Sequence, residues 1–173
     1  MEVSEQEKLI NTLKEKYEGE ILHIEAPYNF LTILLRKEKI VEIIKFLYDH
    51  PATSFQYLTS LAAVHYPDVK QIFVVYQLHN LVNNHRVRLK ISLPEDNAVT
   101  QTLTTVFAAA NWMERETYDF YGVIFEGHPN LQRILNVEEM TIFPMRKEYP
   151  LEDQTREDKD DSMFGRNLQH DVK

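Results

Sequence analysis

The sequence contains no cysteine among its 173 residues. The chain can therefore form no disulfide, offers no thiolate nucleophile and lacks the usual cysteine ligands of an iron–sulfur cluster. If the protein belongs to a redox assembly, its partners must carry the redox centres.

Glycine is scarce, and the histidines are not clustered. The four glycines form neither a G-x-G-x-x-G pattern nor a P-loop, so no nucleotide site is predicted. The seven histidines are scattered without the spacing of a metal-binding pair. We therefore predict no metal site.

A surplus of basic residues is also missing. The chain has 19 Lys and Arg against 27 Asp and Glu, a net charge of -8, whereas nucleic-acid binding needs clustered cations. Apolar runs such as Ile72 to Tyr76 are far shorter than the ~20 residues of a membrane-spanning helix. The acidic start, Met1 to Glu7, lacks the pattern of a secretory signal. These features predict a cytoplasmic chain that reaches a membrane only through a partner.

The order of apolar patterns predicts an α+β fold. The length suits one domain, and 43% hydrophobic with 27% charged residues is typical of a globular protein. Helical spacing and strand-like runs follow one another along the chain. The expected helices are residues 4–17, 37–48 and 99–113, and the expected strands are residues 20–24, 30–35, 55–65, 71–78 and 86–93. This order predicts two layers, in which helices pack on a mixed five-stranded sheet.

The last expected strand has two different faces. Its apolar residues alternate with Arg86, Arg88, Lys90 and Ser92, so one face is expected to be buried and the other to be basic. The basic face is either a docking surface or a solvated one. From Pro144 onward the chain becomes polar, and residues 152–161 include no apolar side chain, which is typical of a tail.

A run of charged and aromatic residues, Glu114 to Gly122, is the most informative part of the sequence. On a helical wheel Glu116 and Asp119 share a face with Trp112, Phe120 and Val123. Buried carboxylates need partners, and Arg115 precedes Asp119 by four residues; Arg86, Arg88 and Lys90 could supply further cations. This pattern favours an ion-pair network that locks the helix to its sheet or to another protein.

A catalytic interpretation of the same run is an alternative. Glu116 and Asp119 could act as an acid–base pair, as two carboxylates do in glycoside hydrolases, which would make the chain a free-standing hydrolase. No nucleophile and no glycine-rich loop accompanies the pair. The spacing alone does not support catalysis.

Two ordered motifs resemble those of a known family. The run from Trp112 to Leu135, with its E-R-E and its His128, resembles the signature of the respiratory-chain NADH dehydrogenase 30-kilodalton subunit family, whose bacterial members are the C subunits of NADH-quinone oxidoreductase. Residues 144–151 are similar to that family's second motif, L-R-K-D-[FY]-P-L. Gln132 departs from the basic residue or proline that is usual at its position.

The resemblance implies a place for the chain in complex I. It implies an α+β domain over residues 1–121 and an extended partner-binding arm with a polar tail over residues 122–173. The implied partners are the large 49-kilodalton-type subunit near the quinone site and the iron–sulfur subunits, on the cytoplasmic side of the inner membrane. No cofactor is expected on this chain, because NADH, flavin, iron–sulfur clusters and quinone belong to the partners. The implied signature or interface residues are Glu114, Arg115, Glu116, Asp119, Phe120, Tyr121, Gly122, His128, Pro129, Arg133, Arg146, Lys147, Tyr149 and Pro150.

Three questions remain open on the sequence. The same module occurs in membrane-bound hydrogenases and in dehydrogenases with other electron donors, which is an alternative assignment. His128 is either an interface contact near the quinone cavity or, as its turn-like surroundings favour, a histidine bonded to nearby backbone. The nine Tyr and nine Phe residues could line a quinone site but are more typical of strands and interfaces.

Overall fold

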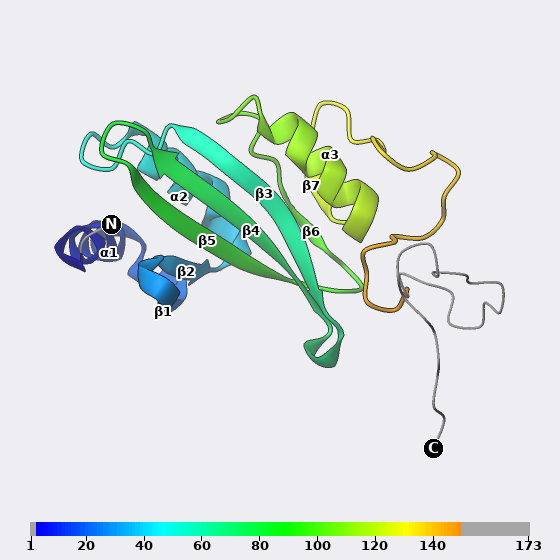
Figure 1. Cartoon of the computed structure of the whole chain (residues 1–173), viewed down its shortest axis with the longest axis horizontal. Coiled ribbons are helices and arrows are strands. Elements are labelled where there is room, and N and C mark those ends of the chain that lie inside the picture. Colours follow the sequence, from blue (N-terminus) through cyan, green and yellow to red (C-terminus); the bar gives the residue numbers. More distant parts are fainter. Residues whose placement is uncertain (1–2, 150–173) are drawn as a thin grey trace, which may run out of the picture.

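One five-stranded sheet dominates the computed structural model, which describes residues 3–149 (Figure 1). The strands are β1 Ile21–Glu25, β2 Thr32–Leu35, β3 Tyr57–Tyr66, β4 Gln71–Asn80 and β5 His85–Pro94. Their order across the sheet is β1-β2-β5-β4-β3. β2 and β5 run parallel while every other neighbouring pair is antiparallel, so the prediction of a mixed five-stranded sheet is confirmed.

Three α-helices accompany the sheet. They are α1 Val3–Tyr17, α2 Ile40–Asp49 and α3 Ala110–Tyr121. Four short 3-10 turns, Glu18–Glu20, Pro27–Asn29, Lys37–Lys39 and Pro67–Val69, connect elements in the first half of the chain. The first two expected helices are confirmed, and α1 and α2 lie in contact, since the ring of Tyr17 meets that of Phe46 edge-on at 5.5 Å.

The helices pack on one face of the sheet, as the alternation in β5 predicts. Val87, Leu89, Ile91 and Leu93 are buried in the core, whereas Arg86 is exposed and Lys90 is only half-buried on the opposite side. Ile43 and Leu47 of α2 belong to the same core. Figure 1 shows α2 behind the sheet, and no helix of the described part of the chain crosses the front face.

The prediction of a helix over residues 99–113 was wrong. Residues 99–101 form β6, Val99–Gln101, which pairs in parallel with β7, Ile124–Glu126. Threonines at positions 100, 102, 104 and 105 explain the difference, because β-branched residues with hydroxyls disfavour helix and bond to nearby backbone. Thr104 N–H, for example, donates to the Thr102 hydroxyl. The helix therefore starts at Ala110, shortly before the charged run.

Residues 127–149 form no helix or strand and return along α3 to the end of β3. The expected arm over residues 122–173 thus begins inside the domain, since β7 pairs with β6, and its second half lies outside the described residues. The boundary at residue 121 stays a prediction. Within residues 3–149, no helix is both long and apolar enough to cross a membrane.

Candidate functional site: helix α3 and the segment anchored to it

Helix α3 ends where the backbone turns back on itself. Gly122 adopts a left-handed conformation at φ 75°, and its N–H donates to the Tyr118 carbonyl at 2.8 Å. A Cβ at this position would lie 2.5 Å from the ring of Phe143, so the segment that returns along the helix passes close against Gly122. Glycine is required here both for the backbone conformation and for this packing.

Glu114 is the first of two fully buried carboxylates on α3. Its oxygens accept hydrogen bonds from the Leu103 N–H at 2.6 Å and from the Thr102 hydroxyl at 2.5 Å. Burial raises the pKa of Glu114 to about 7, against the opposing effect of these two bonds. Glu114 therefore fixes the loop before α3 to the helix and titrates near neutrality.

Asp119 is the second buried carboxylate, and residues 133–136 enclose it. One oxygen accepts the backbone N–H groups of Ile134, Leu135 and Asn136 at 3.1, 2.8 and 2.9 Å. The other accepts Arg133 at 2.7 Å and the Asn136 side chain at 3.0 Å. Burial opposes ionisation, but these donors outweigh it and hold the pKa of Asp119 well below its usual range.

Arg133 extends this anchor to the rest of the returning segment. Besides the Asp119 carboxylate, it donates to the carbonyls of Asp119, Met140 and Ile142 at 2.9, 2.7 and 3.1 Å. Its guanidinium lies 5.2 Å from the centre of the Phe143 ring. Arg133 therefore connects the end of α3 to Met140, Ile142 and Phe143 of the returning segment.

The expectation that Glu116 is one of the buried carboxylates was wrong. Glu116 is exposed, and so is Trp112 at 58%. The two buried carboxylates of α3 are Glu114 and Asp119. The sheet-facing side of α3 runs through Ala110, Glu114 and Thr117, while Asp119 is covered by the returning segment instead. A helical wheel describes one helix alone, so it could not predict that the returning segment buries Asp119.

The predicted cations also differ from the observed ones. Arg115 does not pair with Asp119 but donates to the carbonyls of Gln132 and Arg133 at 3.1 and 3.0 Å, and its guanidinium lies 5.3 Å from the Trp112 ring centre. Arg88 and Lys90 lie on the open face of the sheet. The acid–base interpretation loses its basis, because Glu116 is in solvent and Asp119 is saturated with donors.

The remaining predicted residues lie along the returning segment. His128 is bonded to backbone, with Asn111 O at 3.1 Å from one ring nitrogen and the Asn130 N–H at 3.0 Å from the other, as the turn interpretation predicts. Its contact with a partner subunit stays a prediction. Arg146 donates to the Tyr121 carbonyl at 2.8 Å. Phe120, Tyr121 and Tyr149 are half-buried, Pro129 and the Lys147 side chain are exposed, and Pro150 lies outside the described residues.

His65, Glu95 and Glu148 form the one group in the described part of the chain whose spacing could hold a metal ion. His65 is buried, and its Nε2 lies 3.2 Å from a Glu95 oxygen. However, its Nδ1 accepts the Lys147 N–H at 3.0 Å, which places the proton of the neutral ring on Nε2. A metal-binding histidine normally has its free nitrogen protonated and donating, so this geometry does not suit a metal. His65 instead fastens residue 147 to β3.

Comparison with known proteins identifies the family of this chain. The family model described as the respiratory-chain NADH dehydrogenase 30 Kd subunit matches residues 33–155. The chain belongs to this family. It is also 35% identical over 157 residues to the C subunit of NADH-quinone oxidoreductase from Geobacter metallireducens, a match that covers 90% of this chain and 96% of the relative.

Solved structures support the family fold. A trypsin-resistant fragment of Nqo5 matches with a TM-score of 0.63 at 27% identity, covering 73% of this chain and 99% of the fragment. A membrane-bound sulfane sulfur reductase, an archaeal respiratory membrane complex, contains a chain that matches with a TM-score of 0.70 at 24% identity, covering 84% of this chain and 85% of that one. The second likeness shows a shared fold alone.

Thr102, Leu103 and Asn136 are anchor residues that the sequence did not reveal. Their donors are two backbone N–H groups, a hydroxyl and an amide, which carry no spacing signal. Arg133 was singled out only through the family motif, as an interface residue. Its observed contacts are internal to the chain.

Proposed function

We propose that this chain is a non-catalytic scaffold subunit of NADH:quinone oxidoreductase, docked on the large 49-kilodalton-type subunit near the quinone site. It supports electron transfer from NADH to quinone, coupled to proton translocation, by holding the quinone-site and iron–sulfur subunits in register. The chain binds no flavin, iron–sulfur cluster or quinone itself. It sits on the cytoplasmic side of the inner membrane and meets the membrane only through the complex.

The observation that carries the proposal is the anchoring of residues 127–149 to α3. Asp119 and Arg133 fix the inner side of this segment, and several of its apolar side chains stay exposed to solvent. These exposed side chains, with their exposed fractions, are Leu135 65%, Val137 63%, Ile142 38% and Met145 42%, together with Trp112 58% on the helix. An apolar surface held in place by a buried ion pair is typical of a protein interface.

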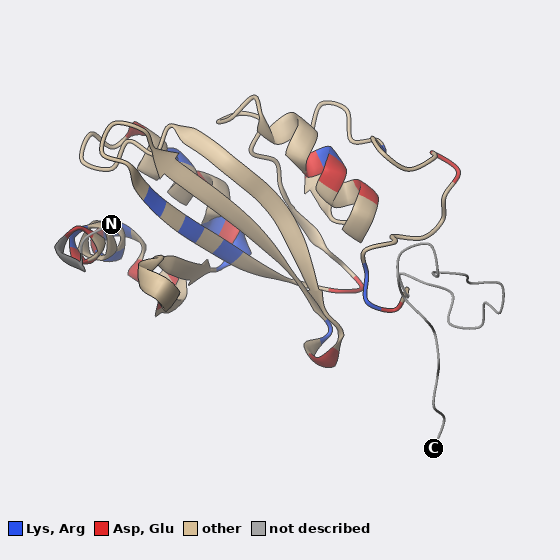
Figure 2. Ribbon diagram, in the orientation of Figure 1, with Lys and Arg blue, Asp and Glu red and all other residues tan. Residues whose placement is uncertain are grey.

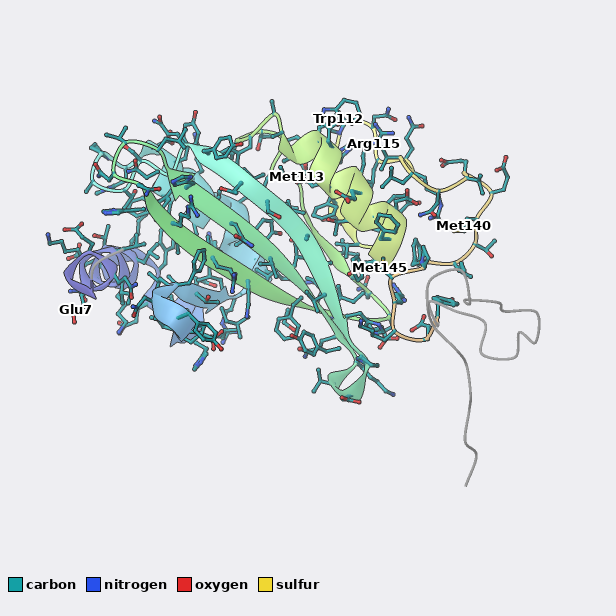
Figure 3. The ribbon with its side chains drawn as sticks, viewed as in Figure 1. Glu7, Trp112, Met113, Arg115, Met140 and Met145 are labelled. Carbon is teal, nitrogen blue, oxygen red and sulfur yellow. The ribbon has the colours of Figure 1, made fainter. Side chains whose placement is uncertain are left out.

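Trp112 and Arg115 are the expected anchors of this interface. Figure 3 shows both residues at the start of α3, away from the sheet. Two backbone carbonyls and the Trp112 ring already fix the Arg115 guanidinium, so little side-chain entropy is lost when a partner binds. Tryptophan and arginine are the residue types that most often dominate binding energy.

The test is retention of the subunit in the purified complex through washes of rising salt. Trp112→Ala should weaken binding about 30-fold or more, the effect of losing one anchor worth ~2 kcal/mol. Leu22→Ala, which removes a side chain 50% exposed on β1, is the matched control and should behave as wild type. Equal retention of the two variants would contradict this interface.

The second candidate function is the equivalent subunit of a related respiratory assembly. The fold match to a chain of an archaeal respiratory membrane complex is the reason to consider it. In a membrane-bound hydrogenase or a dehydrogenase with another electron donor, the chain would hold the same place beside a different large subunit. A flavin-bearing NADH module in the purified assembly supports complex I, whereas a nickel-ligating large subunit moves the chain to a hydrogenase.

A further inference from the structure

The front face of the sheet, opposite the helices, carries a groove of about 620 Å³. Register places its side chains in rows across the strands. Leu34, Lys90, Val75 and Ala62 form one row, and Phe73 with Val64 forms the next. Tyr66 and Val69, which are 51% and 59% exposed, close one end of the groove. The β3–β4 half of this face is therefore apolar and open.

Cations occupy the middle of the face. Arg88 and Lys90 of β5 line this groove. Figure 2 shows blue Lys and Arg bands that alternate with tan along β5, on a sheet that is otherwise mostly tan. Lys90 has a long ion pair with Glu25 at 3.4 Å, and the Arg88 guanidinium lies 4.7 Å from the centre of the Phe30 ring. Among residues 3–149, no carboxylate lies within ion-pair distance of Arg88. The face thus offers a positive charge beside apolar rows, on a chain whose net charge is -8.

We propose that this open face binds a segment of another subunit, whose apolar side chains cover the β3–β4 half and whose carboxylate pairs with Arg88 and Lys90. The proposal rests on the chain being part of a complex, but it concerns a surface separate from α3 and its anchored segment. A carboxylate that pairs with Arg88 would gain a charge-assisted, bidentate bond beside the apolar rows.

Other occupants fit the charges or the apolar rows less well. A second copy docked face to face would set Arg88 and Lys90 against their own copies, which is repulsive. The acidic run at residues 152–161 has the right charge but includes no apolar side chain to fill the groove. An anionic membrane surface attracts clusters of several cations. The lining of this groove holds only two cations, Arg88 and Lys90, together with the carboxylate of Glu25.

Carbodiimide cross-linking of the purified complex identifies the occupant, because this reagent joins an amine to a carboxylate in contact with it. Glu25→Gln removes the internal carboxylate next to Lys90 and leaves the amine for a partner. We expect mass spectrometry to find Lys90 joined to an Asp or Glu of another subunit. A link to this chain's own sequence, or no link at all, would overturn the proposal.

Cysteine footprinting tests the apolar half independently. Since the chain has no native cysteine, Val75→Cys places its sole thiol in the groove, and Asn83→Cys in the exposed β4–β5 turn is the control. Maleimide should modify the Val75→Cys chain at least ~10-fold more slowly in the complex than alone, whereas the Asn83→Cys chain should change little. Equal rates at Val75→Cys in both states would overturn the proposal, as would protection without a protein cross-link to Lys90.

The outcomes separate the two proposals. If the chain fails to purify with any complex, the proposed function fails before the face is tested. If the chain is in the complex and the groove stays reactive, only the docking surface is wrong.

Discussion

Glu114 and Asp119 are buried carboxylates five positions apart on one helix, yet their environments push their acidities in opposite directions. Glu114 receives two hydrogen bonds and Asp119 receives five. Desolvation therefore prevails at Glu114 and hydrogen bonding at Asp119. The number of donors, rather than burial, distinguishes the two residues.

The titration of Glu114 gives a pH-dependent stability. Its folded pKa of about 7 lies above the ordinary value of 4.5, so its contribution is fully present below 4.5 and is lost as pH rises through about 7. Wild type should lose on the order of 3 kcal/mol relative to Glu114→Gln across this window. Urea denaturation of both proteins at a series of pH values measures the difference, and a constant difference would contradict the assignment.

Asp119 should control the local opening of the returning segment. Asp119→Asn keeps the size of the side chain but removes the charge and sets an amide group against N–H donors, at a cost of about 3 to 5 kcal/mol. Hydrogen exchange at the amides of Leu135 and Asn136 should then accelerate by at least ~100-fold. Glu116→Gln is the control, because that exposed residue should change stability by no more than ~0.5 kcal/mol. Unchanged exchange in Asp119→Asn would refute the anchoring role.

At the scale of elements, local periodicity predicted the sheet and two of the three helices. The alternation in β5 correctly predicted which face is buried, because Val87 and Leu89 pack in the core while Arg86 faces water. The limits of α3 were missed because residues 99–101 form β6 by pairing with residues 124–126, and that partner lies beyond the helix in sequence. A local pattern contains no information about such a long-range pairing.

The candidate site was foreseen only in part for the same reason. The charged run correctly indicated a buried ion pair, but Asp119 forms it with the returning segment and not with the sheet. Arg133 and Asn136 reach Asp119 from 14 and 17 positions away. Periodicity suggested Arg115 because it considers only neighbours on one helix. The partners of Asp119 depend on how the returning segment folds back on α3, which the local sequence pattern does not show.

The turn at Gly122 should be intolerant of any side chain. Gly122→Ala would place a Cβ within 2.5 Å of the Phe143 ring in a left-handed conformation, so we expect a loss of about 2 kcal/mol or more in the free energy of unfolding. Gly19→Ala is the matched control, since a Cβ there meets nothing within 4 Å. Thermal denaturation compares the two, and equal midpoints would show that the segment after β7 does not pack on α3 as described.

On the scale of the whole molecule, two exposed surfaces flank one core. On α3 and the segment that returns along it, Trp112, Leu135 and Val137 are among the exposed apolar side chains, and the front of the sheet combines apolar rows with Arg88. The charged side chains of Glu114, Asp119 and Arg133 lie inside the molecule, where they fix the loop before α3 and the returning segment to the helix. This distribution fits a subunit that positions its neighbours.

The most direct test of the scaffold role is to purify the affinity-tagged chain and identify the subunits that purify with it. We expect the large 49-kilodalton-type subunit, the iron–sulfur subunits and a flavin-bearing NADH module to be recovered with it in constant proportion. Recovery of the chain by itself from cells that contain all of these subunits would contradict its role as a scaffold.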